Sequence, residues 1–335
     1  MEPLRIVCIG GGTGLSALLH GLKAYVGDNR QAEITAVVTV TDDGGSSGRL
    51  RREFDVLPPG DIRNCMVALS EDEALLSRLF QYRFGSGRGL KGHSFGNLFL
   101  MAMTHIMGDF SQAVRTSSEI LASRGRIYPA TAQNVTLVAE LESGKEVRGE
   151  TRISRSRSRI RRIRLNPEHC APLPETLEAI AAADLITLGP GSLFTSIVPN
   201  LLVDGFADAL RLSPAIKASY INLMSQPGET SGFSAADHIA AIDAHAGARL
   251  IDVAIVNTGE ISEEMRERYA AERAHPVVND EACLRELGVE ILGASLLRED
   301  GKIRHNSLAA AAIAMELAQR GRNRRQRQWP CTSVS

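Results

Sequence analysis

Short apolar runs alternate with amphipathic stretches along most of the chain. The short runs are rich in branched apolar side chains and have the length of buried strands. They are Arg5–Ile9, Ile34–Val40, Leu185–Leu188, Ala218–Leu223, Leu250–Val256 and Val289–Gly293. The amphipathic stretches predict helices at Leu15–Tyr25, Ala74–Arg83, Phe95–Met107, Phe110–Ser123, Glu175–Ala183, Ala235–Ala246 and Ser307–Gln319. This alternation predicts a Rossmann-like, doubly wound α/β fold, in which a mostly parallel sheet lies between two helical layers.

The pattern changes at about residues 131–165, which we expect to form a strand-rich segment inserted into this fold. Two strand-like stretches, Val135–Leu141 and Lys145–Ile153, flank the turn Glu142–Gly144. They predict a β-hairpin that either joins the edge of the sheet or stands apart from it. Residues 152–164 contain seven arginines. Such a run is either an anion-binding or partner-binding arm or, more commonly, a charged edge strand that resists aggregation.

Residues 1–320 are expected to form one α/β domain with this insertion, because 335 residues only slightly exceed the size at which single cores stop growing. A basic run, Arg320–Arg327, follows the last predicted helix. We expect residues 321–335 to be a basic, disordered tail.

Composition narrows the class of protein. The chain is 44% hydrophobic and 23% charged, as is usual for a globular enzyme or binding protein, and its net charge of −1 argues against a nucleic-acid-binding surface. Its apolar runs are shorter than the roughly 18 residues that a membrane span needs, and no signal peptide precedes the first strand. The five cysteines lack zinc-ligand spacing. These features predict a cytoplasmic protein with no membrane span.

The first strand ends in a glycine-rich loop that is typical of phosphate sites. Its candidate ligand-binding residues are Gly10, Gly11, Gly12, Thr13 and Gly14. Glycines permit positive φ and let a diphosphate approach the N–H groups at the start of the next helix. Gly12, Gly14 and Ala17 fit the dinucleotide-binding spacing, but the acidic residue expected about twenty positions later is not cleanly placed. Ordinary NAD geometry is therefore not expected.

The second strand leads into a loop with two adjacent carboxylates, Asp42 and Asp43, and two hydroxyls, Ser46 and Ser47. Carboxylates at a strand end can coordinate Mg²⁺ or hold a ribose, and the serines can donate to phosphate. The alternative is a tight turn in which an aspartate caps a helix. The position at the ligand-binding edge favours a functional role, with Asp42 and Asp43 as candidate catalytic and metal-binding residues.

The same loop also contains the hydrolase nucleophile pattern Gly-x-Ser-x-Gly around Ser46. It follows the second strand, and the sequence shows no ordered acid and histidine after it, so a serine hydrolase is a minor alternative.

Three further loops carry candidate anion-binding groups. They are Asp61, Arg63 and Asn64; His93, Ser94 and Asn97; and Gly189, Gly191 and Ser192. Arg63 can clamp a phosphate, although its structural alternative is a pair with Asp61. The second group opens an apolar helix, where donors at the N-terminus favour anions, yet a lone histidine is more often a capping or core residue.

Together, the motifs GGGTGLS, TDDGGSSGRLR, LPPGDIRN, GHSFGNL, LGPGSLFTSIVPNLLV and NLMSQPGET resemble the family that joins 2-phospho-L-lactate transferases to the bacterial gluconeogenesis factors, the CofD/YvcK-like family. They occur in family order over most of the chain. The doubled Gly-Gly-Ser-Ser and the PPGDIRN stretch resemble the gluconeogenesis-factor branch more closely. The arginine-rich stretch and the basic tail are not part of the resemblance.

The resemblance implies a nucleotide-type ligand and two candidate functions. In the gluconeogenesis-factor branch, the loops would bind a UDP-sugar, and the protein would regulate carbon use, cell-wall synthesis and cell shape, with cell-wall-synthesis proteins as candidate partners. In the transferase branch, Asp42 and Asp43 would bind Mg²⁺ while a phospholactyl group moves from a GDP-like carrier. We favour the first function, with NAD or a GDP-like nucleotide as alternative ligands and a homodimer as the expected assembly.

A final candidate lies just before the last predicted helix, at Gly301–Ser307. Asn306 or Ser307 can simply cap that helix. The resemblance implies more, because the Arg-His pair here matches the ligand-contacting segment of the gluconeogenesis-factor branch, so Arg304 is expected to contact the ligand.

Overall fold

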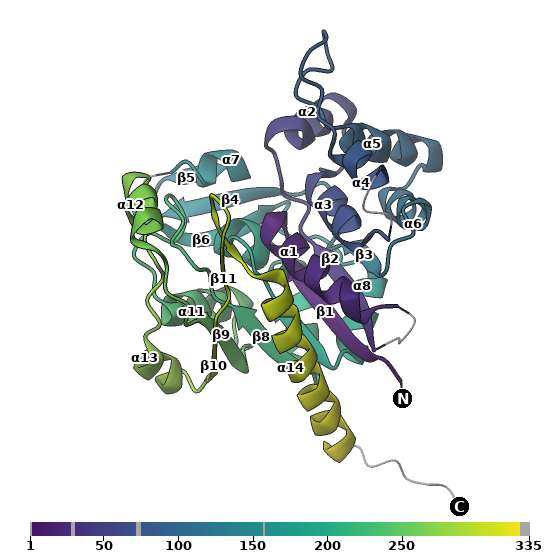
Figure 1. Cartoon of the computed structure of the whole chain (residues 1–335). Coiled ribbons are helices and arrows are strands. Elements are labelled where there is room, and N and C mark those ends of the chain that lie inside the picture. The colour runs from purple at the N-terminus through teal and green to yellow at the C-terminus, as the bar shows by residue number, and fades with distance from the viewer. Residues whose placement is uncertain (1, 28–30, 72–74, 157, 329–335) are drawn as a thin grey trace, which may run out of the picture.

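A computed structural model describes residues 2–27, 31–71, 75–156 and 158–328 of the chain. Its centre is a seven-stranded parallel sheet with the strand order β10-β9-β8-β7-β1-β2-β3 (Figure 1). The strands are β1 Leu4–Gly10, β2 Ala32–Val38, β3 Arg126–Pro129, β7 Leu185–Leu188, β8 Ile216–Tyr220, β9 Val253–Asn257 and β10 Glu290–Ala294. The sheet confirms the predicted doubly wound α/β class. The strand order reverses between β1 and β7, because the chain continues to β2 on one side and to β8 on the other. Sheets of this class bind ligands at the carboxyl ends of the strands at such a point.

All six predicted strands are present, with ends that differ by up to three residues from the sequence-based ranges. The seventh strand, β3, was missed. It has four residues and ends in Pro129, so it lacks the length and composition by which a strand is recognised.

Helices cover both faces of the sheet. On one face, α1 Gly12–Leu22 packs between α3 Gly60–Leu69 and α14 Ser307–Gln328 (Figure 1). The other face carries α8 Pro174–Ala182, α9 Val198–Leu201, α10 Phe206–Leu212 and α11 Ala235–Ala246. The remaining helices are α2 Gly45–Phe54, α4 Leu76–Gln81, α5 Phe95–Met107, α6 Phe110–Ile120, α7 Glu150–Ile153, α12 Glu263–Ala271, α13 Glu281–Glu286, η1 Lys23–Tyr25 and η2 Leu193–Ile197. The start of the predicted helix Ala74–Arg83 lies outside the described residues.

Several segments interpreted as loops are helical. The motifs around Ser46 and around Asp61 form the first turns of α2 and α3. Glycine and proline at these helix starts obscure the helical pattern, because both residues are typical of loops. A short hairpin, β11 Leu297–Glu299 and β12 Ile303–His305, was also missed.

The inserted segment forms a separate antiparallel sheet with the order β5-β4-β6. Its strands are β4 Thr136–Leu141, β5 Glu146–Arg148 and β6 Ile160–Asn166. The expected second strand, Lys145–Ile153, is wrong over its second half, because Gly149 has φ 90° and the chain turns into α7. In the described part of the arginine-rich run, Arg161 and Arg164 pair with Glu140 and Glu146 on β4 and β5, and β6 is an edge strand. This arrangement fits the charged edge strand.

The expectation of a tail from residue 321 is wrong as far as Gln328, because α14 continues to that residue. Arg322 donates to both carboxylate oxygens of Asp184, and Arg325 lies 3.0 Å from the same carboxylate. Asp184 is fully buried at the start of β7. The basic residues therefore anchor the helix to the sheet. Residues 329–335 lie outside the described residues.

The core is a continuous cluster of buried apolar side chains that includes β1, β7, β8, β9 and the inner faces of α1 and α14. Within the described ranges, no single helix is both long and apolar enough to cross a membrane. By length and composition alone, the bent pair Leu193–Leu201 and Phe206–Leu212 passes that test, and its residues are mostly buried in the core.

Candidate functional site

Two glycine loops meet at the carboxyl ends of β1 and β7. The strands are paired in parallel, and a Cβ on Gly10 would lie 3.8 Å from the Cα of Gly189. A Cβ on Gly14 would lie 2.4 Å from the carbonyl oxygen of Pro190. Gly14 is therefore required by the contact between the two loops, before any ligand is considered. Gly12 has φ 65° and lines the cavity, and a Cβ at this position would lie 3.9 Å from Ser196 Oγ, so its backbone is accessible to a ligand.

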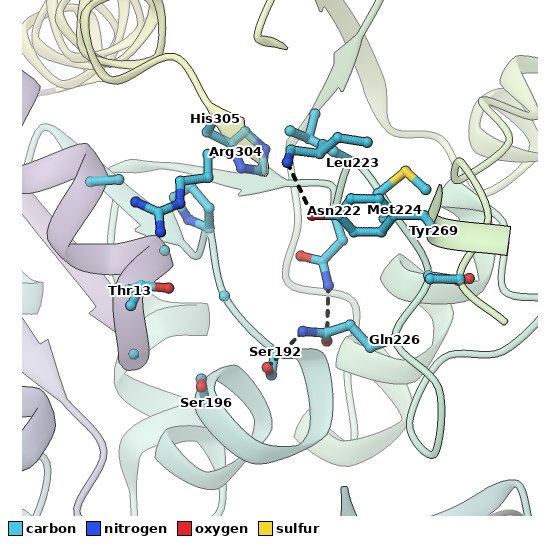
Figure 2. Close-up of a pocket in the computed structure, with 18 of the residues that line it drawn as sticks. Thr13, Ser192, Ser196, Asn222, Leu223, Met224, Gln226, Tyr269, Arg304 and His305 are labelled. Atoms are coloured by element: carbon cyan, nitrogen blue, oxygen red, sulfur yellow. Dashed lines mark hydrogen bonds between the residues drawn. The ribbon is translucent and has the colours of Figure 1, made fainter. Parts of the chain in front are cut away.

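A cavity of about 350 Å³ opens beside these loops (Figure 2). Its volume lies within the range of small-molecule sites. One end is formed by the backbone of Gly11–Gly14 and Gly191 and by the hydroxyls of Ser192 and Ser196. Backbone N–H groups and hydroxyls at a helix start are suited to phosphate oxygens.

The other end of the cavity is apolar and aromatic. Leu223, Met224, Ala274 and the ring of Tyr269 line it (Figure 2). The hydroxyl of Tyr269 accepts a hydrogen bond from Ile303 N–H at 3.0 Å, which fixes the ring on the β11–β12 hairpin. This end can accept a flat ring system by stacking and apolar contact.

A short chain of polar groups connects the two ends. Asn222 Nδ2 donates to Gln226 Oε1 at 3.3 Å, and Gln226 Nε2 donates to Ser192 Oγ at 2.9 Å (Figure 2). Because Gln226 donates to it, Ser192 keeps its own proton for a ligand.

Arg304 reaches from β12 toward the start of α1, where it faces Thr13 across the cavity (Figure 2). The side chain is exposed, and within the described residues its guanidinium has no hydrogen bond or ion pair. An unpaired guanidinium beside a phosphate-type loop is suited to a bidentate contact with an anion. Burial lowers the pKa of the neighbouring His305 to about 4, so this imidazole is neutral at pH 7.

Most of the other predicted residues form a buried polar network next to the cavity rather than lining it. Asn97 Nδ2 donates to Ser47 Oγ at 3.3 Å, and Ser46 shares a 3.0 Å hydrogen bond with His93 Nδ1. Arg63 belongs to the same network.

The guanidinium of Arg63 does not form a hydrogen-bonded pair with Asp61, which was the structural alternative to a phosphate clamp. It donates instead to Ser94 Oγ at 2.7 Å and to Asn64 Oδ1 at 2.6 Å. Burial lowers its pKa. Its Nε atom is buried and has no hydrogen-bond partner among the described residues.

Four carboxylates gather behind the glycine loop. Burial and the neighbouring Asp42 raise the pKa of Asp61 to about 6, although Gly12 N–H donates to its carboxylate. Burial, together with Asp42 and Asp61, raises the pKa of Glu150 to about 9. Burial also raises the pKa values of Asp42 and Glu229. Glu229 Oε1 accepts from the hydroxyls of Ser154 and Thr195, and backbone N–H groups of Phe194 and Thr195 also favour its charged form. The guanidinium groups of Arg51 and Arg63 act on the aspartates of this group, and the carboxylates outnumber them among the described residues.

The predicted aspartate pair does not form a ready metal site. Asp43 Oδ1 accepts from the N–H and hydroxyl of Thr151, at 2.8 and 2.6 Å, and Asp42 Oδ1 accepts from Gly44 N–H at 2.8 Å. Among the residues described, no three His, Cys, Asp or Glu side chains are arranged to hold a metal ion. In this arrangement one oxygen of each carboxylate accepts hydrogen bonds from the protein itself.

The hydrolase alternative gains a hydrogen bond but not a triad. Ser46 and His93 are in contact, yet in the part of the chain that the structure describes no carboxylate hydrogen-bonds to His93. Burial and Arg49 lower the pKa of His93. Both side chains are nearly fully buried, so the pair is a structural contact between α2 and the loop before α5.

The structure thus divides the predicted residues into two groups. Gly11, Gly12, Thr13, Gly14, Gly191, Ser192 and Arg304 line the cavity. Asp42, Asp43, Ser46, Ser47, Asp61, Arg63, His93, Ser94 and Asn97 lie in the polar and acidic groups beside it, with Gly10 and Gly189 behind the loops. Asn64 lines a second cavity.

Other residues were missed. Asn222, Met224 and Gln226 lie in the quoted NLMSQPGET motif, which was the signal for them. Tyr269 and Glu150 come from polar helices without a loop motif, so the sequence pattern offered no signal for either.

Comparisons with known proteins identify the family to which this fold belongs. Residues 6–297 match the family model described as 2-phospho-L-lactate transferase CofD. The chain is 51% identical to a putative gluconeogenesis factor of Nostoc, over 93% of this chain and 68% of that relative. It is 47% identical to the gluconeogenesis factor of Bacillus subtilis, over 93% of this chain and 98% of the relative.

A crystal structure of a Bacillus halodurans protein superposes with a TM-score of 0.90 at 46% identity, and the match covers 94% of this chain and all of that one. Family match, sequence relatives and fold all agree on the same group. The chain therefore belongs to the CofD family, within which its curated relatives are named gluconeogenesis factors.

Proposed function

We propose that this protein binds a nucleoside diphosphate sugar of the UDP-sugar type and acts as a gluconeogenesis factor rather than as a transferase. The observation that carries the proposal is the two-ended cavity beside β1 and β7. Its glycine loops, Ser192 and Arg304 suit a diphosphate, and the apolar end at Tyr269 suits a nucleobase.

The carboxylates behind the loop favour binding over group transfer. A transferase needs cationic groups to neutralise charge that develops on the transferred group. Here Asp42 and Asp43 are engaged by backbone and hydroxyl donors, and Arg304 is the unpaired cation of the cavity lining in the described structure. One guanidinium can bind a diphosphate without catalysing its transfer.

As a gluconeogenesis factor of this kind, the protein would sense nucleotide sugar in the cytoplasm as a homodimer. It would regulate carbon use, cell-wall synthesis and cell shape through protein partners of the wall-synthesis machinery. The names of its relatives support the link to gluconeogenesis.

Calorimetric titration of the full chain with UDP-N-acetylglucosamine, GDP and NAD, with and without Mg²⁺, tests the proposal. We expect saturable binding of the UDP-sugar, weaker binding of the other two, and no product formation from a phospholactyl-GDP carrier. Equal or absent binding of all three nucleotides would contradict the proposed ligand, and Mg²⁺-dependent phospholactyl transfer would establish the transferase instead.

A further inference from the structure

A second cavity, of about 550 Å³, lies between α1, α3, α4 and the β11–β12 hairpin. Thr13, Ala17, Arg304 and His305 line both this cavity and the first one. The two cavities therefore adjoin at Arg304 and at Thr13 of the glycine loop.

The lining of the second cavity differs in chemistry from that of the first. Ser16 and His20 lie along one face of α1, and Gln81 faces them from the end of α4. The amide of Gln81 and the imidazole of His20 offer both donors and acceptors, the combination that hydroxyl groups require. The Ser16 hydroxyl, which donates to Thr13 O at 3.0 Å, offers an acceptor. Val67 and Ala68 on α3 add an apolar patch.

The charges in the second cavity argue against a second anion site. Arg298 lies 2.9 Å from Asp300, so the guanidinium on the hairpin already has a carboxylate partner. His20 and Gln81 are exposed, and within the described residues neither side chain is hydrogen-bonded. In the described structure the cavity thus provides the unpaired polar side chains of His20 and Gln81, whereas the unpaired guanidinium of Arg304 lies at the junction with the first cavity.

We propose that the second cavity binds the sugar of the nucleoside diphosphate sugar and determines which sugar is accepted. The proposal rests on the proposed function. The ligand then extends from a base at Tyr269, through a diphosphate at the glycine loops and Arg304, to a sugar among Ser16, His20 and Gln81.

The test compares UDP with UDP-N-acetylglucosamine, because UDP lacks the sugar. Calorimetry on the full chain would measure both dissociation constants for the wild type, for the double variant His20→Ala/Gln81→Ala, and for Ser16→Phe, which fills the cavity from α1. The control is His169→Ala/Gln319→Ala, which removes the same two side-chain types at exposed positions outside both cavities. Thermal melts establish that each variant is folded, which is expected at the exposed positions His20, Gln81, His169 and Gln319 and is checked in the same way at the half-buried Ser16.

We expect UDP to bind all variants within about twofold of the wild type. The double variant should bind the UDP-sugar about three- to thirtyfold more weakly, since it loses one or two neutral hydrogen bonds, and Ser16→Phe should weaken it at least as much. Unchanged UDP-sugar affinity in both variants, or equal loss for UDP and UDP-sugar, would overturn the inference and leave the proposed function standing. Failure of the wild type to bind either ligand would overturn the proposed function and the inference with it.

Discussion

At the amino end of the central sheet, the buried carboxylate of Asp184 is matched by two arginines of α14 and by Arg5 N–H. At the carboxyl end, Asp42, Asp61, Glu150 and Glu229 lie close together, and the two guanidinium groups near the aspartates, Arg51 and Arg63, donate to neutral groups. Burial of an unmatched charge is costly, whereas a matched pair mainly fixes geometry. A buried carboxylate thus has a structural role at the amino end of the sheet and indicates a candidate site at the carboxyl end.

Removing the matched carboxylate should have the largest effect. Asp184→Ala leaves Arg322 and Arg325 facing a buried pocket without their partner, and breaking such a pair costs about 3–5 kcal/mol. We expect the free energy of unfolding, measured by urea denaturation, to fall by this amount while the folded variant keeps its ligand affinity. Asp208→Ala, which removes an exposed partner of Arg211, is the control and should change stability by less than about 0.5 kcal/mol. Equal losses in the two variants would remove the distinction between the two ends.

Removing an unmatched carboxylate should raise the free energy of unfolding instead of lowering it. Asp61→Asn keeps an acceptor for Gly12 N–H but removes a charge whose pKa is raised from 3.8 to about 6, so stability at pH 7 should rise by up to about 3 kcal/mol. The folded wild type binds the proton more tightly than the unfolded chain, so its stability should fall as the pH rises from about 4 to about 6. The variant should lack this part of the pH dependence, and the two proteins should be similar below about pH 4. Urea denaturation between pH 4 and pH 7 measures both curves, and a variant less stable than the wild type at pH 7 contradicts the account.

Removing Arg304, the unpaired cation at the carboxyl end in the described structure, should weaken ligand binding and leave the stability of the fold unchanged. Arg304→Ala removes a charge-assisted contact worth about 1.5–3 kcal/mol, so UDP-N-acetylglucosamine should bind roughly ten- to a hundredfold more weakly. Thermal unfolding without ligand should stay unchanged, because the side chain is exposed and, in the described structure, unpartnered. Arg88→Ala, at an exposed position away from the cavity, serves as the control in the same titration. Undiminished affinity of Arg304→Ala would mean that this segment only begins α14.

The sequence predicted the architecture because most strands of the central sheet have a recognisable apolar composition. Runs such as Leu185–Leu188 are mainly apolar, and a strand buried on both faces needs that composition whatever surrounds it. The strand-end loops were recognisable for a similar reason, since the positive φ of Gly12 and the contact of Gly14 with Pro190 leave little choice but glycine. Local conformational requirements of this kind restrict the residue type directly, so they can be recognised in the sequence.

Tertiary structure decided which of those residues line a cavity and which lie in the buried network. Asp42 and Ser47 were predicted to bind the ligand, but they lie in the buried network. Tyr269 and Gln81 lie on helices without a recognisable motif, and they line the cavities. The basic run at residues 320–327 looked like a tail until the helix placed Arg322 against Asp184, which lies 138 residues away in the chain. Local propensities act over a few residues, so sequence by itself determined the strands, the glycine turns and the family. Which side chains meet across long separations, and which charges stay unmatched, follows only from packing distant segments together.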